Sequence, residues 1–209
     1  ALMRAAITAY PSSLQEKKPD CLHSILGFIR QRLDVYLQSP GFSNDEITAV
    51  LEPVWTDQSS NKDIADAVIR LQAIQHIRTL PDFNALSAGF KRACNILTQA
   101  QEQHTLFRED ISADSFTEPA ELNLFHTFAK IKNSFPALHD KENAVVTQID
   151  YQNILTRMVS LRPALDEFFE TVMVMVDQED IRSNRLGLLN QVVNLYRKIA
   201  DFSQFIPKT

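Results

Sequence analysis

The chain has 209 residues, of which 44% are hydrophobic, and 26 acidic residues against 21 basic ones give it a formal net charge of −5 at pH 7. This is enough chain to bury a large core as one domain or two small ones. The composition argues against glycine-rich phosphate loops, a membrane span and secretion, because it holds only 4 glycines, no run of about 18 apolar residues and no signal-peptide cleavage pattern, so we expect a cytoplasmic protein.

Apolar residues recur every three or four positions along most of the chain, a spacing that predicts an all-α protein built as a multi-helix bundle. Residues 1–9 are expected to form the tail of a helix that Tyr10-Pro11 ends. A long amphipathic helix is expected after Pro19, with Asp20 as its N-cap. It should end at residues 39–41, which read Ser-Pro-Gly.

Residues 43–46, Ser-Asn-Asp-Glu, match a capping box, in which the serine hydroxyl and the glutamate carboxylate each accept a hydrogen bond from a free amide at a helix start. We expect a short helix through Leu51 after this cap. The polar stretch 53–62, which begins with a proline, is expected to be irregular.

Another apolar stripe predicts a helix from Ile64 to Ile77, and Leu80-Pro81 should end it. This break is the best candidate for a domain boundary. We therefore expect residues 1–80 to be a helical connecting segment, the end of a preceding helical domain, and residues 81–209 to be a separate helical bundle.

The bundle is predicted to begin with a helix from Phe83 to Ala100, which presents polar residues on the side opposite its apolar stripe. A loop over residues 107–116 should end that helix. The sequence Thr-Glu-Pro at 117–119 is typical of a helix start, and the helix that follows should break at Phe135-Pro136.

Residues 137–148 are expected to be a mobile connection. The next helix carries Tyr151 to Met158, and Pro163 either kinks it or starts a second helix that reaches Val176. The last helix is predicted from about Ile181 to Phe202.

No catalytic or metal-binding motif emerges. The five histidines lie on different segments without metal-ligand spacing, no phosphate-binding or nucleophile-elbow glycine motif is present, and Cys21 and Cys94 lack a C-x-x-C partner. Neither predicted part is basic, since residues 1–80 hold 8 basic and 9 acidic side chains and residues 81–209 hold 13 and 17. A nucleic-acid binder commonly shows a basic stripe, so bulk charge argues mildly against one.

Two small polar patches could bind a ligand. In the first, Arg182 and Arg185 oppose the positive end of a helix macrodipole, and either nearby carboxylates or an external anion, such as an RNA phosphate, could compensate. Asn184 lies between them, and Arg185 falls on the apolar face, which favours a buried, structural arginine. The second patch has Lys91 and Asn95 on the exposed helix face and Arg92 on its flank, although a lysine there is usually only solvated.

Several stretches of the chain together resemble the β subunit of bacterial, two-subunit glycyl-tRNA synthetase. They are KRACNIL at 91–97, LDEFFETVMVM at 165–175, RSNRLGLL at 182–189, and the ending IADFS at 199–203. The stretch from residue 2 through the helix at 70–80 looks like the region that precedes these blocks in that subunit. The resemblance therefore spans nearly the whole chain.

Membership of this family implies that residues 81–209 form an α-helical, DALR-like anticodon-binding domain similar to those of arginyl- and other synthetases. It implies tRNA(Gly) as partner, together with an α subunit or fused α segment that performs the ATP- and Mg²⁺-dependent chemistry, so that this segment itself needs no cofactor. On this basis we assign tRNA contact to six residues: Lys91, Arg92, Asn95, Arg182, Asn184 and Arg185.

Two other functions stay open. One is a helical interaction module that contacts the catalytic subunit or other parts of its own subunit, which suits the acidic charge balance. The other is an independent enzyme, which the sequence disfavours because no nucleophile–base pair or cofactor loop can be assembled from it.

Overall fold

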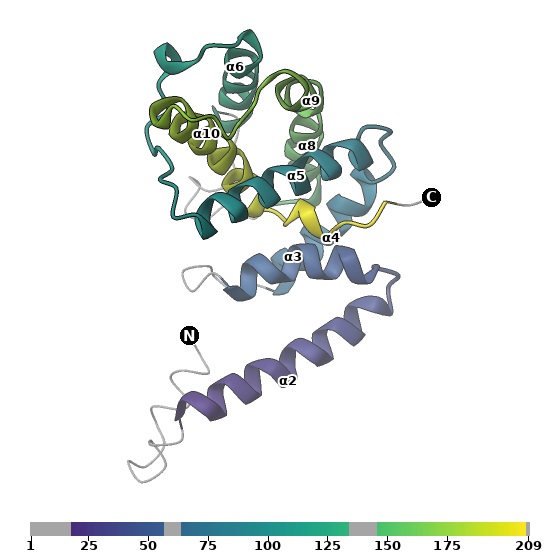
Figure 1. The fold of residues 1–209 in the computed structure, drawn as a ribbon. Helices are drawn as coiled ribbons and strands as arrows, with labels where there is room; N and C mark the ends of the chain where they lie inside the picture. The colour runs from purple at the N-terminus through teal and green to yellow at the C-terminus, as the bar shows by residue number, and fades with distance from the viewer. Residues whose placement is uncertain (1–17, 57–63, 134–145, 208–209) are drawn as a thin grey trace. The chain divides into compact units, whose positions relative to one another are not determined.

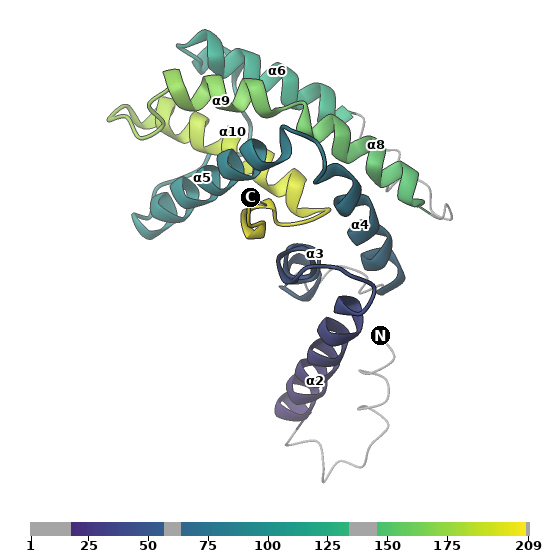
Figure 2. The same cartoon turned by 90° about the vertical axis from the view of Figure 1, so that its right-hand side faces the viewer.

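A computed structural model describes residues 18–56, 64–133 and 146–207, and every regular element in these ranges is helical (Figure 1, Figure 2). The all-α prediction is thus confirmed. The chain divides into two compact units, residues 1–47 and residues 48–209. The expected helix tail at 1–9 and most of the connection expected at 137–148 lie outside the described residues.

The first unit contains the long helix α2, Lys18–Gln38, and the start of α3, Asn44–Thr56. Our N-cap assignment was wrong, because α2 begins before Asp20 and includes Pro19. Proline is tolerated in a first helical turn, where its missing N–H would have no intrahelical partner anyway. Gly41, at φ 96°, makes the turn between the helices, and its N–H donates to the Gln38 carbonyl at 3.0 Å.

Helix α3 starts as its capping chemistry predicts. The Glu46 carboxylate accepts from the Ser43 backbone N–H at 3.0 Å, which confirms that half of the capping box. The helix does not end at Leu51, however, but continues through Pro53 to Thr56. Pro53 has no N–H to donate to the carbonyl of Ala49, and that carbonyl instead accepts from the backbone N–H of Asp201 at 2.7 Å.

Helix α4, Ile64–Ile77, packs against α8, Gln148–Val159, in the second unit. The hydroxyl of Tyr151 donates to Asp66 at 2.6 Å, and Asp66 also pairs with Arg70. The Arg70 guanidinium donates in addition to the Lys198 carbonyl at 3.2 Å. Burial, partly offset by the charge of Arg70 and reinforced by the bond to Asp66, raises the pKa of Tyr151 to about 12.

Helix α5, Phe83–Glu102, contributes two rings of its apolar side to an aromatic cluster in the second unit. Ring centroids in this cluster lie 5.0 to 5.8 Å apart, and its members are Phe83, Phe90, Tyr196, Phe202 and Phe205. Phe202 belongs to the short 3-10 helix η3, Phe202–Gln204, beyond the end of α10, Glu179–Arg197. We predicted one helix to Phe202, but the chain turns back after Arg197 (yellow in Figure 1), and η3 packs against α5. The Phe202 ring thereby contacts Phe83 and Phe90 of α5.

Helix α6, Pro119–Asn133, packs on α9, Arg162–Thr171, and also contacts α10. Of the two roles left open for Pro163, the structure shows the helix start, because it occupies the first turn of α9. The helix ends at Thr171, so Val172 and Val176 follow it in an extended loop rather than continuing the stripe.

The loop between α5 and α6, which includes the 3-10 helix η2, Ala113–Ser115, is held against α10. Arg108 N–H donates to the Ser183 carbonyl at 3.1 Å, and the Gln191 amide donates to the Glu109 carbonyl at 2.7 Å. Gly187 permits this approach, since a Cβ built on it would lie 2.1 Å from the Arg108 carbonyl oxygen. The surface loop is therefore held against α10 through its own backbone groups.

The domain boundary proposed after residue 80 stays a prediction. Along the sequence, the first compact unit ends at Ile47 and the second begins at Thr48. Helix α4 packs within the second unit. In the three described ranges, no helix is both long and apolar enough to cross a bilayer.

Candidate nucleic-acid interface

The solvent-exposed side of α5 is a nearly continuous polar stripe. Its members are spaced by three or four positions and all are exposed: Asn84, Ala88, Lys91, Asn95, Thr98 and Glu102. Arg92 and Gln99 are exposed on its flank. Lys91, Arg92 and Asn95 therefore lie together on one accessible face, as the sequence predicts.

Arg92 is held by a second helix. Its guanidinium carbon lies 4.6 Å from the ring centroid of Phe169 on α9, and that ring is buried. A cation over an aromatic ring is stabilised by the ring's quadrupole. The contact positions the charge at the surface while the side chain stays exposed.

Cys94 and Arg197 lie between α5 and the end of α10. The guanidinium donates to the Cys94 sulfur at 3.8 Å, and its Nε lies 3.6 Å from an Asp201 carboxylate oxygen. Burial raises the pKa of the Cys94 thiol to about 11, although Arg197 acts in the opposite direction. This thiol is therefore protonated near neutral pH and a poor nucleophile.

Arg182, in the first turns of α10, holds the loop that leads into its own helix. Its Nη1 donates to the carbonyls of Val176 at 2.7 Å and Asp177 at 3.2 Å. We considered two partners for the Arg182 charge, nearby carboxylates and an external anion. The contacts that the structure describes are local, but backbone carbonyls make them rather than the upstream carboxylates. The side chain is half-buried and lines a small pocket with five other residues.

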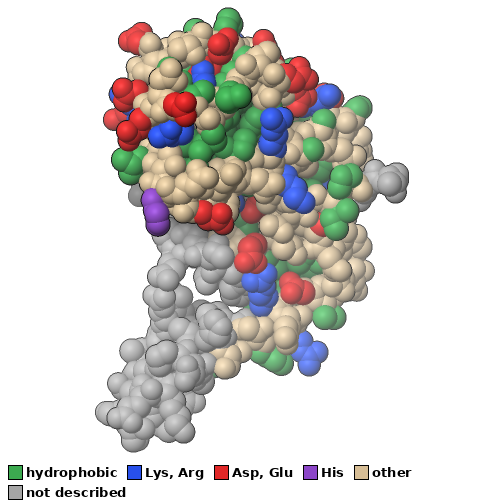
Figure 3. All heavy atoms as spheres, in the orientation of Figure 1, with side chains coloured by type: hydrophobic (Ala, Val, Ile, Leu, Met, Phe, Trp, Pro, Cys, Tyr) green, Lys and Arg blue, Asp and Glu red, His purple; other side chains and the backbone are tan. Residues whose placement is uncertain are grey.

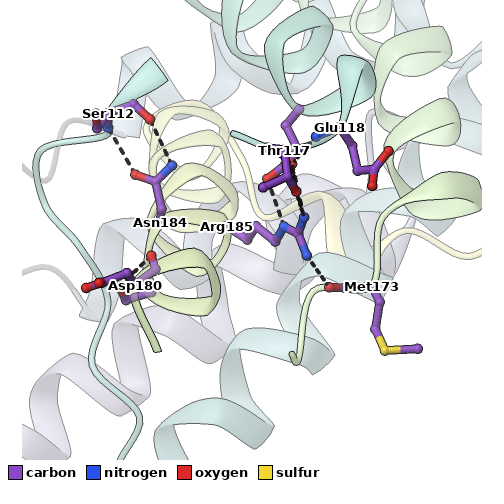
Figure 4. A network of polar contacts seen from close by, with 9 residues as sticks. Ser112, Thr117, Glu118, Met173, Asp180, Asn184 and Arg185 are labelled. Atoms are coloured by element: carbon purple, nitrogen blue, oxygen red, sulfur yellow. Dashed lines mark hydrogen bonds and ion pairs between the residues drawn. The ribbon is translucent and has the colours of Figure 1, made fainter. Parts of the chain in front are cut away.

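Asn184 is fully buried and bonded to the α5–α6 loop (Figure 4). Its Oδ1 accepts from the Ser112 N–H and its Nδ2 donates to the Ser112 carbonyl, both at 3.0 Å. The amide thus satisfies both backbone groups of one residue, which gives it an internal role. This position does not support the RNA contact that we assigned to it.

Arg185 is buried as its helical position predicts, with 4% of its surface exposed. It forms a bidentate pair with Glu121 on α6 and donates to the Thr117 hydroxyl and the Met173 carbonyl, each at 2.8 Å (Figure 4). Burial alone would raise the pKa of Glu121, but hydrogen bonds from Arg185 and two backbone N–H groups hold it below its usual 4.5. These bonds leave Arg185 with internal partners, so its RNA contact is likewise unsupported.

The structure therefore separates the six candidates into three groups. Lys91, Arg92 and Asn95 lie on an open surface, whereas Asn184 and Arg185 face inward and Arg182 lies at a pocket. Figure 3 shows Lys and Arg side chains interspersed with Asp and Glu over the described part of one face.

Sequence reasoning missed Glu121, although a glutamate in the first turn after Thr117 is a recognisable helix-start signal.

No cluster of three or more histidine, cysteine, aspartate or glutamate side chains suited to a metal ion occurs within the described ranges. The arrangement offers hydrogen-bond donors, two exposed cations and an amide on a rigid helix. Such a surface can bind an RNA backbone and base edges.

Comparison with known proteins confirms the resemblance drawn from the sequence. Residues 86–206 match the DALR anticodon binding domain. The chain is 33% identical over 98% of its length to a protein of Acidobacterium capsulatum named glycine–tRNA ligase beta subunit, and 34% identical over 98% to one of the same name from Desulforapulum autotrophicum. It spans 28% and 27% of these two relatives. Because the family match covers more than half of the chain, including most of α5 and all of α6, α8, α9 and α10, the protein belongs to the family of DALR anticodon binding domains.

Proposed function

We propose that the exposed face of α5 binds the anticodon loop of tRNA(Gly). The observation that carries this proposal is the position of Lys91, Arg92 and Asn95, which lie exposed on one helix inside the region that matches an anticodon binding domain. Single-stranded loops are the usual targets of sequence-specific RNA binding, because their bases can be splayed out and stacked.

Arg92 has the geometry for a stacking platform. Phe169 supports its guanidinium from the protein side, and the exposed side chain leaves a surface open to solvent. Unstacked bases pack on arginine planes as well as on aromatic rings. A loop base that stacks here would extend the existing contact between Arg92 and Phe169.

Lys91 and Asn95 would complete this contact one turn apart on the same face. A lysine supplies a mobile point charge for a phosphate, and an asparagine supplies the donor and acceptor that base edges require. With two cations on this face and a net charge of −5, binding should depend on a few local contacts. Its salt dependence should therefore be shallow.

The proposal extends to the parent enzyme. The relatives are named glycine–tRNA ligase beta subunits, so this chain would support glycylation of tRNA(Gly) in the cytoplasm, while ATP and Mg²⁺ act in a catalytic α subunit or fused α segment. Binding the anticodon loop would contribute to catalysis by positioning the acceptor end, because binding energy remote from the reacting bond can orient it.

The test is a gel-shift titration of the 209-residue chain with tRNA(Gly) at two salt concentrations, with tRNA(Gly) whose anticodon has been exchanged as control. The proposal requires tighter binding of the native anticodon at both salt concentrations. Equal affinity for the two RNAs would contradict it.

One observation favours a second function, contact with another protein surface. Helix α2 exposes large apolar side chains along one side, namely Ile25, Phe28, Val35 and Tyr36, with exposed fractions from 37% to 69%. Their spacing of three, seven and one residues places them within one face of the helix. An exposed apolar stripe is typical of a protein–protein contact, and the catalytic subunit is the partner we propose.

A Phe28→Ser, Val35→Ser double variant tests this second function. It should weaken co-purification with the α subunit and leave tRNA binding by the chain unchanged. Unchanged co-purification would remove α2 from the assembly interface.

A further inference from the structure

A small pocket lies where the end of α5 meets the loop between α9 and α10. Its volume is about 380 Å³, and it is lined by Gln103, Thr105, Met175, Val176, Asp177 and Arg182. Small-molecule sites in proteins start at about 300 Å³. This pocket therefore has room for a single nucleotide-sized group and not for a duplex.

Two sets of hydrogen bonds build the pocket walls. His104 adopts the left-handed conformation, φ 54°, while its N–H donates to the Gln101 carbonyl and the Thr105 N–H donates to the Ala100 carbonyl, both at 2.9 Å. This pattern is a Schellman motif with histidine in the position where glycine is usual. The tight turn brings Gln103 and Thr105 to the same cavity, opposite the loop that Arg182 fixes.

The charges in the pocket favour a nucleobase over a bare phosphate. Arg182 and Asp177 carry opposite formal charges, and a carboxylate in the lining would repel an anion. Gln103 and Thr105 add groups that can donate or accept, and Met175 and Val176 add apolar surface. A neutral planar ring with donors and acceptors on its edge matches this combination.

Arg182 has capacity left for a ligand. Its Nη1 is bonded to two carbonyls, but its Nε is shielded from solvent and has no partner among the described residues. A buried donor without a hydrogen-bond partner is costly, so an acceptor that reaches it would be favoured. An acceptor that enters the pocket could provide that partner after a small shift of the side chain.

The pocket also lies on the same helix as the proposed RNA-binding face. Twelve residues separate Lys91 from Gln103, or roughly 18 Å along the α5 axis at 1.5 Å per residue. The exposed stripe of α5 continues between them through Asn95, Thr98 and Glu102. A loop bound on that stripe could thus extend one nucleotide towards the end of the helix.

We propose that this pocket receives one unstacked base of the bound RNA and contributes to base discrimination. This inference rests on the tRNA binding proposed above. Asp177 would accept from an exocyclic amino group, and the Arg182 guanidinium would donate to a ring nitrogen or carbonyl oxygen. The role of Arg182 in RNA binding would then be base contact inside a pocket.

The test combines abasic tRNA with pocket variants of the full 209-residue chain. tRNA(Gly) is prepared with a single abasic nucleotide at each position of the anticodon loop in turn. For the native chain, at least one abasic position should weaken binding roughly tenfold. The Thr105→Val, Asp177→Asn variant preserves the backbone contacts. In this variant, the loss of affinity caused by the abasic nucleotide should fall to roughly twofold or less at one of the positions that matter for the native chain.

Two controls make the result specific. Glu179→Gln removes the same charge two residues from Asp177 without touching the pocket lining, and it should keep the native abasic profile. If circular dichroism shows that the double variant does not fold, the variant Gln103→Ala, at an exposed position, is used in its place. The same reduction in the abasic effect is expected. An abasic profile identical in native and pocket-variant chains would overturn the pocket while leaving the α5 face in place. Failure of the native chain to bind tRNA(Gly) would overturn both.

Discussion

Arg185 of α10 and Glu121 of α6 form a buried bidentate ion pair, with Nε–Oε1 at 2.8 Å and Nη2–Oε2 at 3.0 Å. Glu121 also accepts from the backbone N–H groups of Thr117 and Glu118 at the start of α6. One carboxylate thus joins the start of α6 to α10.

Removing the cation of this pair should lower the free energy of unfolding strongly, and by an amount that depends on pH. Arg185→Met should lower the free energy of unfolding by about 3–5 kcal/mol at pH 7, because it leaves the Glu121 carboxylate buried without its partner. Since the folded-state pKa of Glu121 is below 4.5, the pair stabilises the fold above that pH and loses its effect as pH falls through the folded-state value. Urea unfolding of native and variant chains should therefore show a smaller difference at pH 3 than at pH 7. An equal difference at both pH values would contradict the assignment.

Asn184 should affect stability and not RNA affinity. Asn184→Asp replaces the donor to the Ser112 carbonyl with a buried charged oxygen, so the free energy of unfolding should fall by about 3 kcal/mol. The exposed Asn194→Asp on the same helix changes the charge equally and should have little effect on unfolding. A loss of tRNA affinity in folded Asn184→Asp protein, without such destabilisation, would restore its role as an RNA contact.

Gly187 should tolerate no side chain. Gly187→Ala drives a methyl group against the Arg108 carbonyl, so we expect a loss of about 1–3 kcal/mol in chemical unfolding as the loop moves off α10. Gly27→Ala in α2 is the matched control, because a Cβ there would meet no atom within 4 Å. That change should stabilise α2 by about 0.5–1 kcal/mol. A neutral Gly187→Ala would show that the loop is not held as described.

The contribution that the planar guanidinium of Arg92 makes to tRNA affinity should be separable from the contribution of its charge. Arg92→Lys keeps the charge but loses the flat guanidinium over Phe169, so tRNA affinity should fall by about 1 kcal/mol while the salt dependence of binding is unchanged. Lys91→Arg retains the charge of the adjacent residue on the same face and should bind as the native chain does. If Arg92→Lys also binds normally, Arg92 acts only through its charge.

The sequence predicts those features whose cause is local. The capping residue Glu46, the helix start at Pro119 and the exposed stripe through Lys91 and Asn95 all depend on neighbours within one or two helical turns. Their positions in the structure follow the prediction.

Features that depend on distant partners could not be predicted. Helix α3 continues past Pro53 because the freed Ala49 carbonyl bonds to Asp201, and α10 stops before Phe202 because that ring packs among aromatic residues of α5. Asn184 looks like an available polar residue in the sequence, yet its partner Ser112 lies 72 positions away. Only the folded chain shows which of the polar residues are already occupied.

The most direct test of the α5 face is the affinity of the Lys91→Ala, Arg92→Ala chain for tRNA(Gly) as a function of salt. Its matched control, Lys130→Ala with Arg157→Ala, removes the same charge from exposed positions on α6 and α8. We predict that only the α5 variant loses its preference for the native anticodon and that the slope of log affinity against log salt falls by about 1 for each phosphate that the variant no longer neutralises. Equal losses in the two variants, or a preserved anticodon preference in the α5 variant, would contradict anticodon binding by this face.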